Sequence, residues 1–213
     1  MRKAIIAIVV SYAGMAQAEE VVIAALGDSL TQGYGLAVEE GFVPQLQRWL
    51  DGAGAEVRLI NAGVSGDTTA GGLARVDWTL TPEVGGMIVA LGANDILRGL
   101  DPVAARKNLE GILQGAQNAQ VEVLLVGMQA NGNYGAEYKQ QFDAIYPELA
   151  ETYEVLYADS FFVGLMQDGV LPQLSDLLPL LQADGLHPNA TGVAQIVEGL
   201  GPQVLELAQQ AAD

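Results

Sequence analysis

The sequence contains no cysteine and only one histidine, His187, in 213 residues. The absence of cysteine excludes disulfide bonds, a cysteine nucleophile, and zinc or iron–sulfur sites with cysteine ligands. Aromatic residues make up 6% of the chain and charged residues 16%, while hydrophobic residues make up 50%. This composition is typical of a globular domain and excludes a disordered, collagen-like or coiled-coil chain. Any chemistry that needs an imidazole must use His187.

Basic residues are also scarce, because 9 Lys and Arg face 26 Asp and Glu, for a net charge of −17. Binding to nucleic acid needs clustered Lys and Arg, so the sequence predicts no nucleic-acid partner. The same shortage excludes a polybasic membrane patch. The acidic balance predicts a soluble domain that is repelled from anionic surfaces.

The one extended apolar run of the first residues has the features of a secretory signal peptide. Arg2 and Lys3 are followed by apolar residues 4–16 and by Ala16-Gln17-Ala18, an A-x-A cleavage signal. We expect a signal peptide over residues 1–18 and a single domain over residues 19–213. A buried first strand and an uncleaved anchor remain alternatives, although spanning a bilayer takes about 20 apolar residues. The expected protein is exported, periplasmic or secreted from a bacterium, with no stable membrane anchor after cleavage.

Five short apolar runs predict strands, and most of them are continuous rather than alternating, as expected for strands buried on both faces. They are Val21–Leu26, Val57–Ile60, Met87–Leu91, Val121–Val126 and Val155–Tyr157. The longer segments between and after them predict helices. These are Val43–Leu50, Thr69–Leu80, Pro102–Ala119, Ala136–Glu151 and Ala190–Ala211.

Strands that alternate with helices predict an α/β fold, with a central parallel sheet of about five strands between two helical layers. Ligands of such sheets bind beyond the carboxyl ends of the strands. Ser29 follows the first predicted strand, where a turn into a helix would expose its hydroxyl and leave backbone N–H groups free. The alternative is that Asp28 or Ser29 only caps that helix.

Asp184 and His187 lie three residues apart in a loop that contains Gly185 and Pro188. The carboxylate could orient the imidazole, and the imidazole could take a proton from a serine. The alternative is a surface histidine beside an ordinary turn. The order Ser, Asp, His is that of the α/β-hydrolases, but the chain has no G-x-S-x-G elbow.

Gly63 and Asn94 follow the second and third predicted strands and could donate hydrogen bonds to a developing oxyanion. The alternative is that Gly63 serves a turn and that Asn94 caps a helix.

Four segments together resemble the sequence blocks of the GDSL, or SGNH, hydrolases, in the order of that family. They are Gly27-Asp28-Ser29-Leu30, Asn61-Ala62-Gly63-Val64-Ser65-Gly66-Asp67-Thr68, Leu91-Gly92-Ala93-Asn94-Asp95 and Asp184-Gly185-Leu186-His187-Pro188-Asn189. The subgroup that the chain is most similar to is that of exported bacterial arylesterases, thioesterases I and lysophospholipases L1. Within the family, the resemblance implies a flavodoxin-like three-layer α/β/α fold with no metal and no cofactor.

Carried over by position, the resemblance implies Ser29 as nucleophile, His187 as base and Asp184 as the third member of a triad. It implies that the Ser29 N–H, the Gly63 N–H and the Asn94 side chain form an oxyanion hole. The implied activity is hydrolysis of a small acyl ester, thioester or lysophospholipid through an acyl-enzyme. A carbohydrate O-acetylesterase and a catalytically silent binding module of the same fold are the alternatives.

Two further segments are candidates for substrate contact. The Leu-rich stretch Phe161–Leu181 could form an acyl-binding lid or an amphipathic helix that completes the core, and 133–135 resembles a loop of the subgroup. The candidate residues are Asn133, Tyr134, Leu165, Met166, Leu171, Leu177 and Leu178. Because no exposed heptad seam is present, we expect a monomer.

Overall fold

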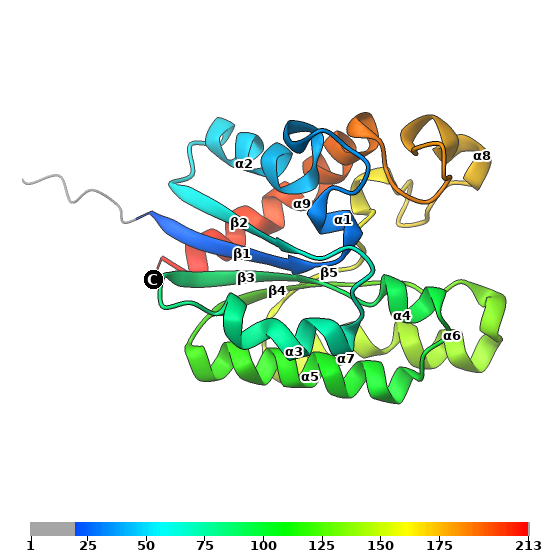
Figure 1. Cartoon of the computed structure of the whole chain (residues 1–213), viewed down its shortest axis with the longest axis horizontal. Coiled ribbons are helices and arrows are strands. Elements are labelled where there is room, and N and C mark those ends of the chain that lie inside the picture. The colour runs from blue at the N-terminus through cyan, green and yellow to red at the C-terminus, as the bar shows by residue number, and fades with distance from the viewer. Residues whose placement is uncertain (1–19, 213) are drawn as a thin grey trace, which may run out of the picture.

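A computed structural model describes residues 20–212, and the predicted signal peptide lies outside the described residues. The chain forms one five-stranded parallel sheet in the order β2-β1-β3-β4-β5 (Figure 1). The strands are β1 (Val21–Gly27), β2 (Val57–Gly63), β3 (Val84–Ala90), β4 (Glu122–Val126) and β5 (Leu156–Ala158). The predicted α/β fold with five parallel strands is confirmed.

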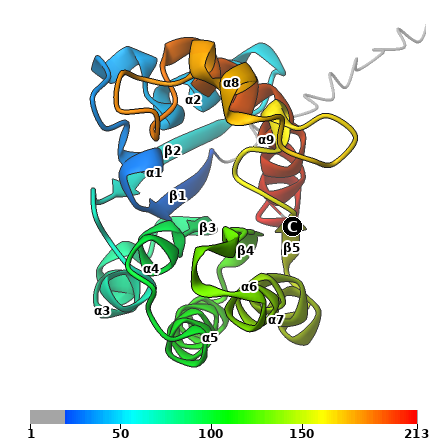
Figure 2. The same cartoon turned by 90° about the vertical axis from the view of Figure 1, so that its right-hand side faces the viewer.

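Helices cover both faces of the sheet, so that the molecule has three layers (Figures 1 and 2). The helices on one face are α1 (Ser29–Gln32), α2 (Phe42–Gly52), α8 (Leu174–Leu177) and α9 (Ala190–Gln210). Those on the other face are α3 (Thr69–Thr79), α4 (Ala93–Leu97), α5 (Pro102–Ala119), α6 (Ala136–Asp143) and α7 (Ile145–Tyr153). Short 3₁₀ turns are η1 (Val38–Glu40), η2 (Gly132–Tyr134), η3 (Val163–Leu165) and η4 (Leu178–Leu180). Among residues 20–212, no helix is long and apolar enough to cross a membrane.

The inner strands are buried on both faces, which explains their continuous apolar sequences. Every residue of β1 after Val21 is buried, as is every residue of β4 after Glu122. The edge strand β2 is only partly covered and carries the polar residues Arg58 and Asn61. Since apolar burial stabilises a fold by about 25 cal/mol per Å², the inner strands form the centre of a core that the helices on both faces complete.

One predicted helix is divided in the structure. The segment Ala136–Glu151 forms α6 and α7, which meet at Ala144. Pro147 explains the break, because its ring has no N–H for the carbonyl of Asp143 and would clash with that carbonyl in a continuous helix. The carboxylate of Asp143, at the end of α6, accepts hydrogen bonds from the Ala130 N–H at 2.7 Å and from the Lys139 ammonium at 2.6 Å.

The strand order reverses beside β1, and this reversal places the candidate site. From β1 the chain moves outward to β2, and then returns to β3 on the other side of β1. The connections after β1 and β3 therefore depart to opposite faces, with α1 on one side and α4 on the other (Figure 1). A crevice at the carboxyl ends of the strands is expected at such a switch point.

Candidate active site

Ser29 lies at the crevice because β1 ends in a sharp turn directly into α1. The carboxylate of Asp28 caps this short helix by accepting the Leu30 N–H at 3.0 Å. Gly27 is required at the end of the strand, since a Cβ atom there would overlap the side chain of Thr31. The turn therefore holds Ser29 at the first position of the helix, where the backbone N–H groups have no helical acceptor.

Ser29, His187 and Asp184 form a continuous hydrogen-bonded chain. The Oγ atom of Ser29 lies 2.9 Å from Nε2 of His187, and Nδ1 of His187 lies 2.7 Å from Oδ2 of Asp184. The His187 side chain is 15% exposed, and the ring of Tyr34 packs against it with 4.8 Å between the ring centroids. The sequence placed Asp184 and His187 in one loop and Ser29 in another, 158 positions before His187, and the fold brings the two loops together.

Asp184 is held as a carboxylate by the donors around it. The His187 ring and the backbone N–H groups of Leu186 and His187 lower its pKa from 3.8 to about 2. Both N–H groups donate to Oδ1, at 2.9 and 3.0 Å, which leaves Oδ2 for the imidazole. An ionised carboxylate at Nδ1 fixes the tautomer in which Nε2 accepts a proton from a hydroxyl.

A cavity of about 350 Å³ opens beside Ser29 at the carboxyl ends of the strands. Most of its lining is apolar, and among the described residues that line it there is no Lys, Arg or Glu. The apolar lining residues are Leu30, Ala93, Ile96, Leu97, Met128, Phe162, Leu171 and Leu186. The polar ones include Asp28, Ser29, Ser65, Asn94, Gln129, Asn131, Ser160 and His187. Such a lining suits an uncharged apolar group placed next to a reactive centre.

The structure does not place Gly63 in this cavity, which corrects the prediction that its N–H faces the substrate. Gly63 ends the edge strand β2, and its N–H donates to Oδ1 of Asn61 at 3.0 Å. A Cβ at position 63 would lie 2.8 Å from the Cα of Gln32 and 2.9 Å from the carbonyl carbon of Thr31. Glycine is needed here because the backbone of α1 packs directly on the strand.

Gly66, three residues further along, lies in the cavity where Gly63 was expected. It lines the cavity beside Ser29 and Asn94, with a φ of 80° that a glycine adopts without strain. Its carbonyl accepts a hydrogen bond from Arg98 at 2.7 Å. Within residues 20–212, no acceptor is bonded to the N–H of Gly66 or to that of Ser29. Both groups are therefore free to donate to a ligand.

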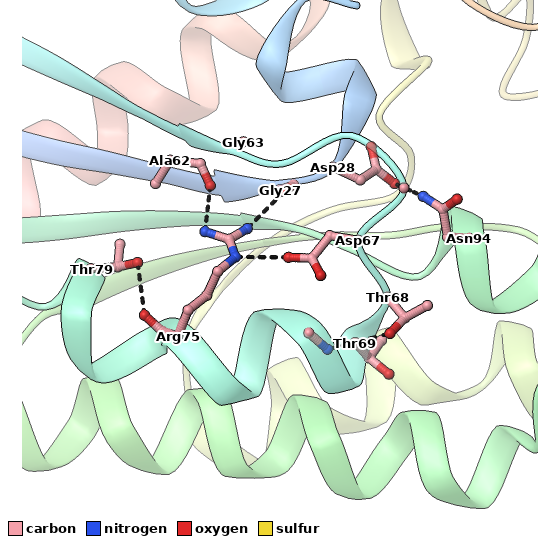
Figure 3. Close-up of polar contacts among 12 residues, drawn as sticks. Gly27, Asp28, Ala62, Gly63, Asp67, Thr68, Thr69, Arg75, Thr79 and Asn94 are labelled. Carbon is pink, nitrogen blue, oxygen red and sulfur yellow. Dashed lines mark hydrogen bonds and ion pairs between the residues drawn. The ribbon is translucent and has the colours of Figure 1, made fainter.

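Asn94 lines the cavity from the start of α4, and its orientation is fixed by Asp28. Its Nδ2 donates to Oδ2 of Asp28 at 3.2 Å (Figure 3). Since an amide nitrogen carries two hydrogens, the second remains for the cavity. The contact also fixes the orientation of the amide. An ionised carboxylate only accepts hydrogen bonds, so it faces the Nδ2 of Asn94 and not the Oδ1.

Asp28 is fully buried, and burial raises its pKa from 3.8 to about 6, although the Leu30 N–H and the Asn94 amide partly oppose this shift. Above pH 6 the carboxylate is ionised and accepts from both groups. Below it, the protonated acid can donate to the oxygen of Asn94 and so release the nitrogen from its orientation.

Of the seven residues predicted to contact substrate, only Leu171 lines the cavity. Leu165 is 5% exposed, belongs to the core and packs with η3 on α9, while Leu177 is half-buried against that core. The Tyr134 hydroxyl donates to the Leu97 carbonyl at 3.2 Å. The remaining three, which are partly or largely exposed, are Asn133, Met166 and Leu178. The Leu-rich stretch is thus divided between core, cavity wall and surface.

Several residues of the cavity were not predicted, although the position of most of them after a strand was a signal in the sequence. Phe162 and Ser160 line it directly after β5, and Met128 and Gln129 line it after β4, so both pairs follow the rule for carboxyl ends of strands. Applying that rule to every strand would have found them. Tyr34 lies beyond α1, where nothing in the sequence indicates a contact with His187.

Comparison with known proteins identifies the family of this chain. A sequence profile described as the GDSL-like Lipase/Acylhydrolase family matches residues 25–195. The chain is 33% identical over 192 residues to Esterase TesA of Pseudomonas aeruginosa, with 90% of this chain and 91% of that protein covered. It is 34% identical over 185 residues to Thioesterase 1/protease 1/lysophospholipase L1 of Escherichia coli, with 85% and 82% covered.

Solved structures of known esterases have a similar fold. The crystal structure of AlinE4, described as an SGNH-hydrolase family esterase, is 42% identical and has a TM-score of 0.71, covering 89% of this chain and 97% of that one. The esterase EstA from Pseudoalteromonas, in a structure described as inhibited by monoethylphosphonate, is 31% identical with a TM-score of 0.76, covering 87% and 97%. The similarity extends over nearly the whole described chain.

Proposed function

Since the chain belongs to the GDSL-like lipase/acylhydrolase family and is a carboxylic ester hydrolase, we propose that Ser29, His187 and Asp184 are its catalytic triad. The observation that carries this proposal is the hydrogen-bonded chain at 2.9 and 2.7 Å that opens on an apolar cavity. A catalytically silent binding module would have no reason to keep this alignment.

The first half of the reaction forms an acyl-enzyme. Oγ of Ser29 attacks the ester carbonyl carbon while Nε2 of His187 takes the hydroxyl proton. The tetrahedral oxyanion accepts hydrogen bonds from the Ser29 N–H, the Gly66 N–H and the Asn94 amide, with Gly66 in the role first assigned to Gly63. As the intermediate collapses, the ester C–O bond breaks and His187 gives its proton to the departing alkoxide.

The second half releases the acid. A water molecule attacks the acyl carbonyl while Nε2 of His187 accepts one of its protons. The same oxyanion donors stabilise the second tetrahedral intermediate. The bond to Oγ of Ser29 then breaks, His187 returns the proton to that oxygen, and the free enzyme is restored. Asp184 stays ionised throughout and stabilises the imidazolium in each step.

The substrate class follows from the cavity wall. An apolar lining without basic residues favours the acyl chain of a neutral ester over the phosphates of an acyl-CoA, which a protein of net charge −17 repels. Thioesters and lysophospholipids without a strongly anionic group use the same chemistry and remain within the proposal. A carbohydrate O-acetylesterase is less favoured, because a sugar is polar and its acetyl group alone would meet the apolar lining.

We expect the enzyme to prefer medium acyl chains, and Leu171→Ala to reduce this preference. The variant removes apolar contact worth about 1–2 kcal/mol, so kcat/KM for p-nitrophenyl octanoate is expected to fall about 5–30-fold. The value for p-nitrophenyl acetate is expected to change less than about twofold. Leu174→Ala is the matched control, because Leu174 is 60% exposed in the same segment and does not line the cavity. Equal losses on both esters would assign Leu171 a structural role only.

Export is a second part of the proposal. Arg2, Lys3 and the Ala16-Gln17-Ala18 signal support cleavage after Ala18. The first strand starts at Val21, so that cleavage would leave the whole sheet intact. Mass spectrometry of the protein recovered from the periplasm or medium of a bacterial host is expected to give an N-terminus at Glu19. Full-length protein in the cytoplasm would contradict export, and the monomeric state stays a prediction.

A further inference from the structure

The side chain of Arg75 joins three separate segments behind the candidate site (Figure 3). From α3, its Nε donates to the Asp67 carboxylate at 2.7 Å, its Nη1 to the Ala62 carbonyl at 2.7 Å and its Nη2 to the Gly27 carbonyl at 2.9 Å. The side chains of Arg75 and Asp67 are 22% and 13% exposed. A planar guanidinium with three partners in different directions is held in one orientation, which a lysine could not reproduce.

Two of these partners, Gly27 and Asp67, lie within two residues of a proposed oxyanion donor. Gly27 ends β1 two residues before Ser29, and its carbonyl also accepts the Val64 N–H at 3.0 Å. Asp67 directly follows Gly66. Arg75 therefore fixes the position of the turn that carries one donor relative to the loop that carries another.

The N-terminal end of α3 holds the third donor in the same way. The N–H and hydroxyl of Thr69 donate to the Asp95 carboxylate at 2.9 and 2.7 Å, and Asn108 donates to the Thr69 hydroxyl at 3.0 Å. Asp95, which is buried, directly follows Asn94. One helix thus connects all three donors, through Thr69 at its start and through Arg75 in its second turn.

The space around Asp67 is also adapted to this contact. A Cβ at Gly71, one turn before Arg75 on α3, would overlap the Asp67 carboxylate. Burying a charged pair is costly, and such a pair often stabilises a fold less than apolar residues of the same size would. The pair therefore calls for an explanation other than stability, and its position behind the oxyanion donors supplies one.

We propose that Arg75 is a positioning residue, which sets the positions of the donors on Ser29 and Gly66 relative to each other and to α3, the helix whose first residue, Thr69, holds the loop of Asn94. This inference rests on the proposed function. Arg75 does not line the cavity, so its loss leaves the binding of the acyl chain unchanged. Oxyanion donors act mainly in the transition state, and a displacement of about 1 Å can cost about 100-fold in rate. The expected signature is therefore a fall in kcat at an almost constant KM.

The test compares Arg75→Lys and Arg75→Met with Arg58→Met. Arg58 is the matched control. It also pairs with carboxylates, those of Glu20 and Glu83, but it lies near the start of β2, whereas Ala62 lies near its end. Each protein is assayed with p-nitrophenyl butyrate, its concentration of active sites is titrated with a fluorophosphonate, and its thermal unfolding is recorded. We expect kcat per titrated site to fall about 10–100-fold in Arg75→Lys and further in Arg75→Met, with KM within about twofold. Arg58→Met is expected to keep the wild-type kcat.

Two results overturn the proposal for Arg75, and a third overturns the proposed function on which it rests. If the Arg75 variants keep the wild-type kcat per titrated site, or lose activity only through KM, Arg75 does not position the donors. If neither variant folds at 25 °C, Arg75 is a determinant of the fold as a whole. If wild-type and Arg58→Met protein release no p-nitrophenol, the proposed function itself fails, which is a separate result.

Discussion

Ser29→Ala is expected to lower kcat for p-nitrophenyl butyrate by at least about 10⁴-fold. In a serine hydrolase the nucleophile, base and third member act as one unit, so removing the hydroxyl removes the acyl-enzyme pathway altogether. The remaining rate comes from oxyanion donors and substrate binding alone. The fold is expected to persist, because the Oγ of Ser29 bonds to His187 in the described structure and supports no part of the core.

Ser65→Ala is the matched control for this substitution. The hydroxyl of Ser65 lies in the wall of the same cavity and donates to Oε1 of Gln32 at 2.8 Å, but no base stands beside it. We expect it to lose less than about 10-fold in kcat. Circular dichroism and thermal unfolding establish that both variants are folded. An Ser29→Ala enzyme that keeps more than about 1% of the wild-type kcat would exclude Ser29 as the nucleophile.

Asp28→Asn is expected to make the protein more stable and much less active. The Leu30 N–H needs an acceptor, so the new amide would present its oxygen there and its nitrogen to Asn94. Asn94 would then rotate to accept this nitrogen, and its own oxygen would occupy the place of the donor nitrogen. An oxygen facing the oxyanion is repulsive, and losing one such donor costs about 10²–10³ in kcat.

The stability effect of Asp28→Asn follows from the raised pKa of Asp28. Folding moves this pKa from 3.8 up to about 6, so the folded state keeps a proton that the unfolded state releases between these values. The free energy of unfolding therefore falls as the pH rises through this window, by about 3 kcal/mol at most. Asparagine does not titrate. The variant is expected to be about 1–3 kcal/mol more stable than wild type at pH 8 and nearly equal to it at pH 4.

Urea unfolding at pH 4 and pH 8 measures this difference, with kcat determined at pH 8. Asp101→Asn is the matched control, because Asp101 caps α5 in the same way, by accepting the N–H of Val103 two residues on at 2.9 Å, but is exposed. Asp101→Asn is expected to change neither the free energy of unfolding nor kcat appreciably, since asparagine caps a helix as well as aspartate does. Wild-type activity in Asp28→Asn would contradict the role of this carboxylate in orienting Asn94.

The strands and most of the helices could be predicted from the sequence because each depends on local patterns. The helix Pro102–Ala119 has the predicted bounds, since Asp101 caps it and a proline fits its first turn. The strand order could not be predicted, because continuous apolar strands do not specify which neighbour they pair with. The break between α6 and α7 was missed even though Pro147 indicates it.

The triad was the most predictable part of the site, since the chain offers one histidine and an aspartate three residues before it. The oxyanion donors were less predictable, because a glycine can serve a close packing contact or a ligand. In Gly63 the requirement is the contact with α1, whereas Gly66 faces the cavity. The substrate contacts were the least predictable, because leucines of one segment lie in three environments. The packing of η3 on α9 buries Leu165, and such a tertiary contact cannot be predicted from the spacing of the leucines.

The central claim is that Ser29 is a nucleophile activated by His187, and labelling with a fluorophosphonate tests it most directly. The domain from residue 19 onward contains four serines, Ser29, Ser65, Ser160 and Ser175. Mass spectrometry of the labelled protein is expected to find the adduct on Ser29 alone, and to find none in folded His187→Ala protein. An adduct on another serine, or unlabelled Ser29 in a folded wild-type sample, would contradict the account.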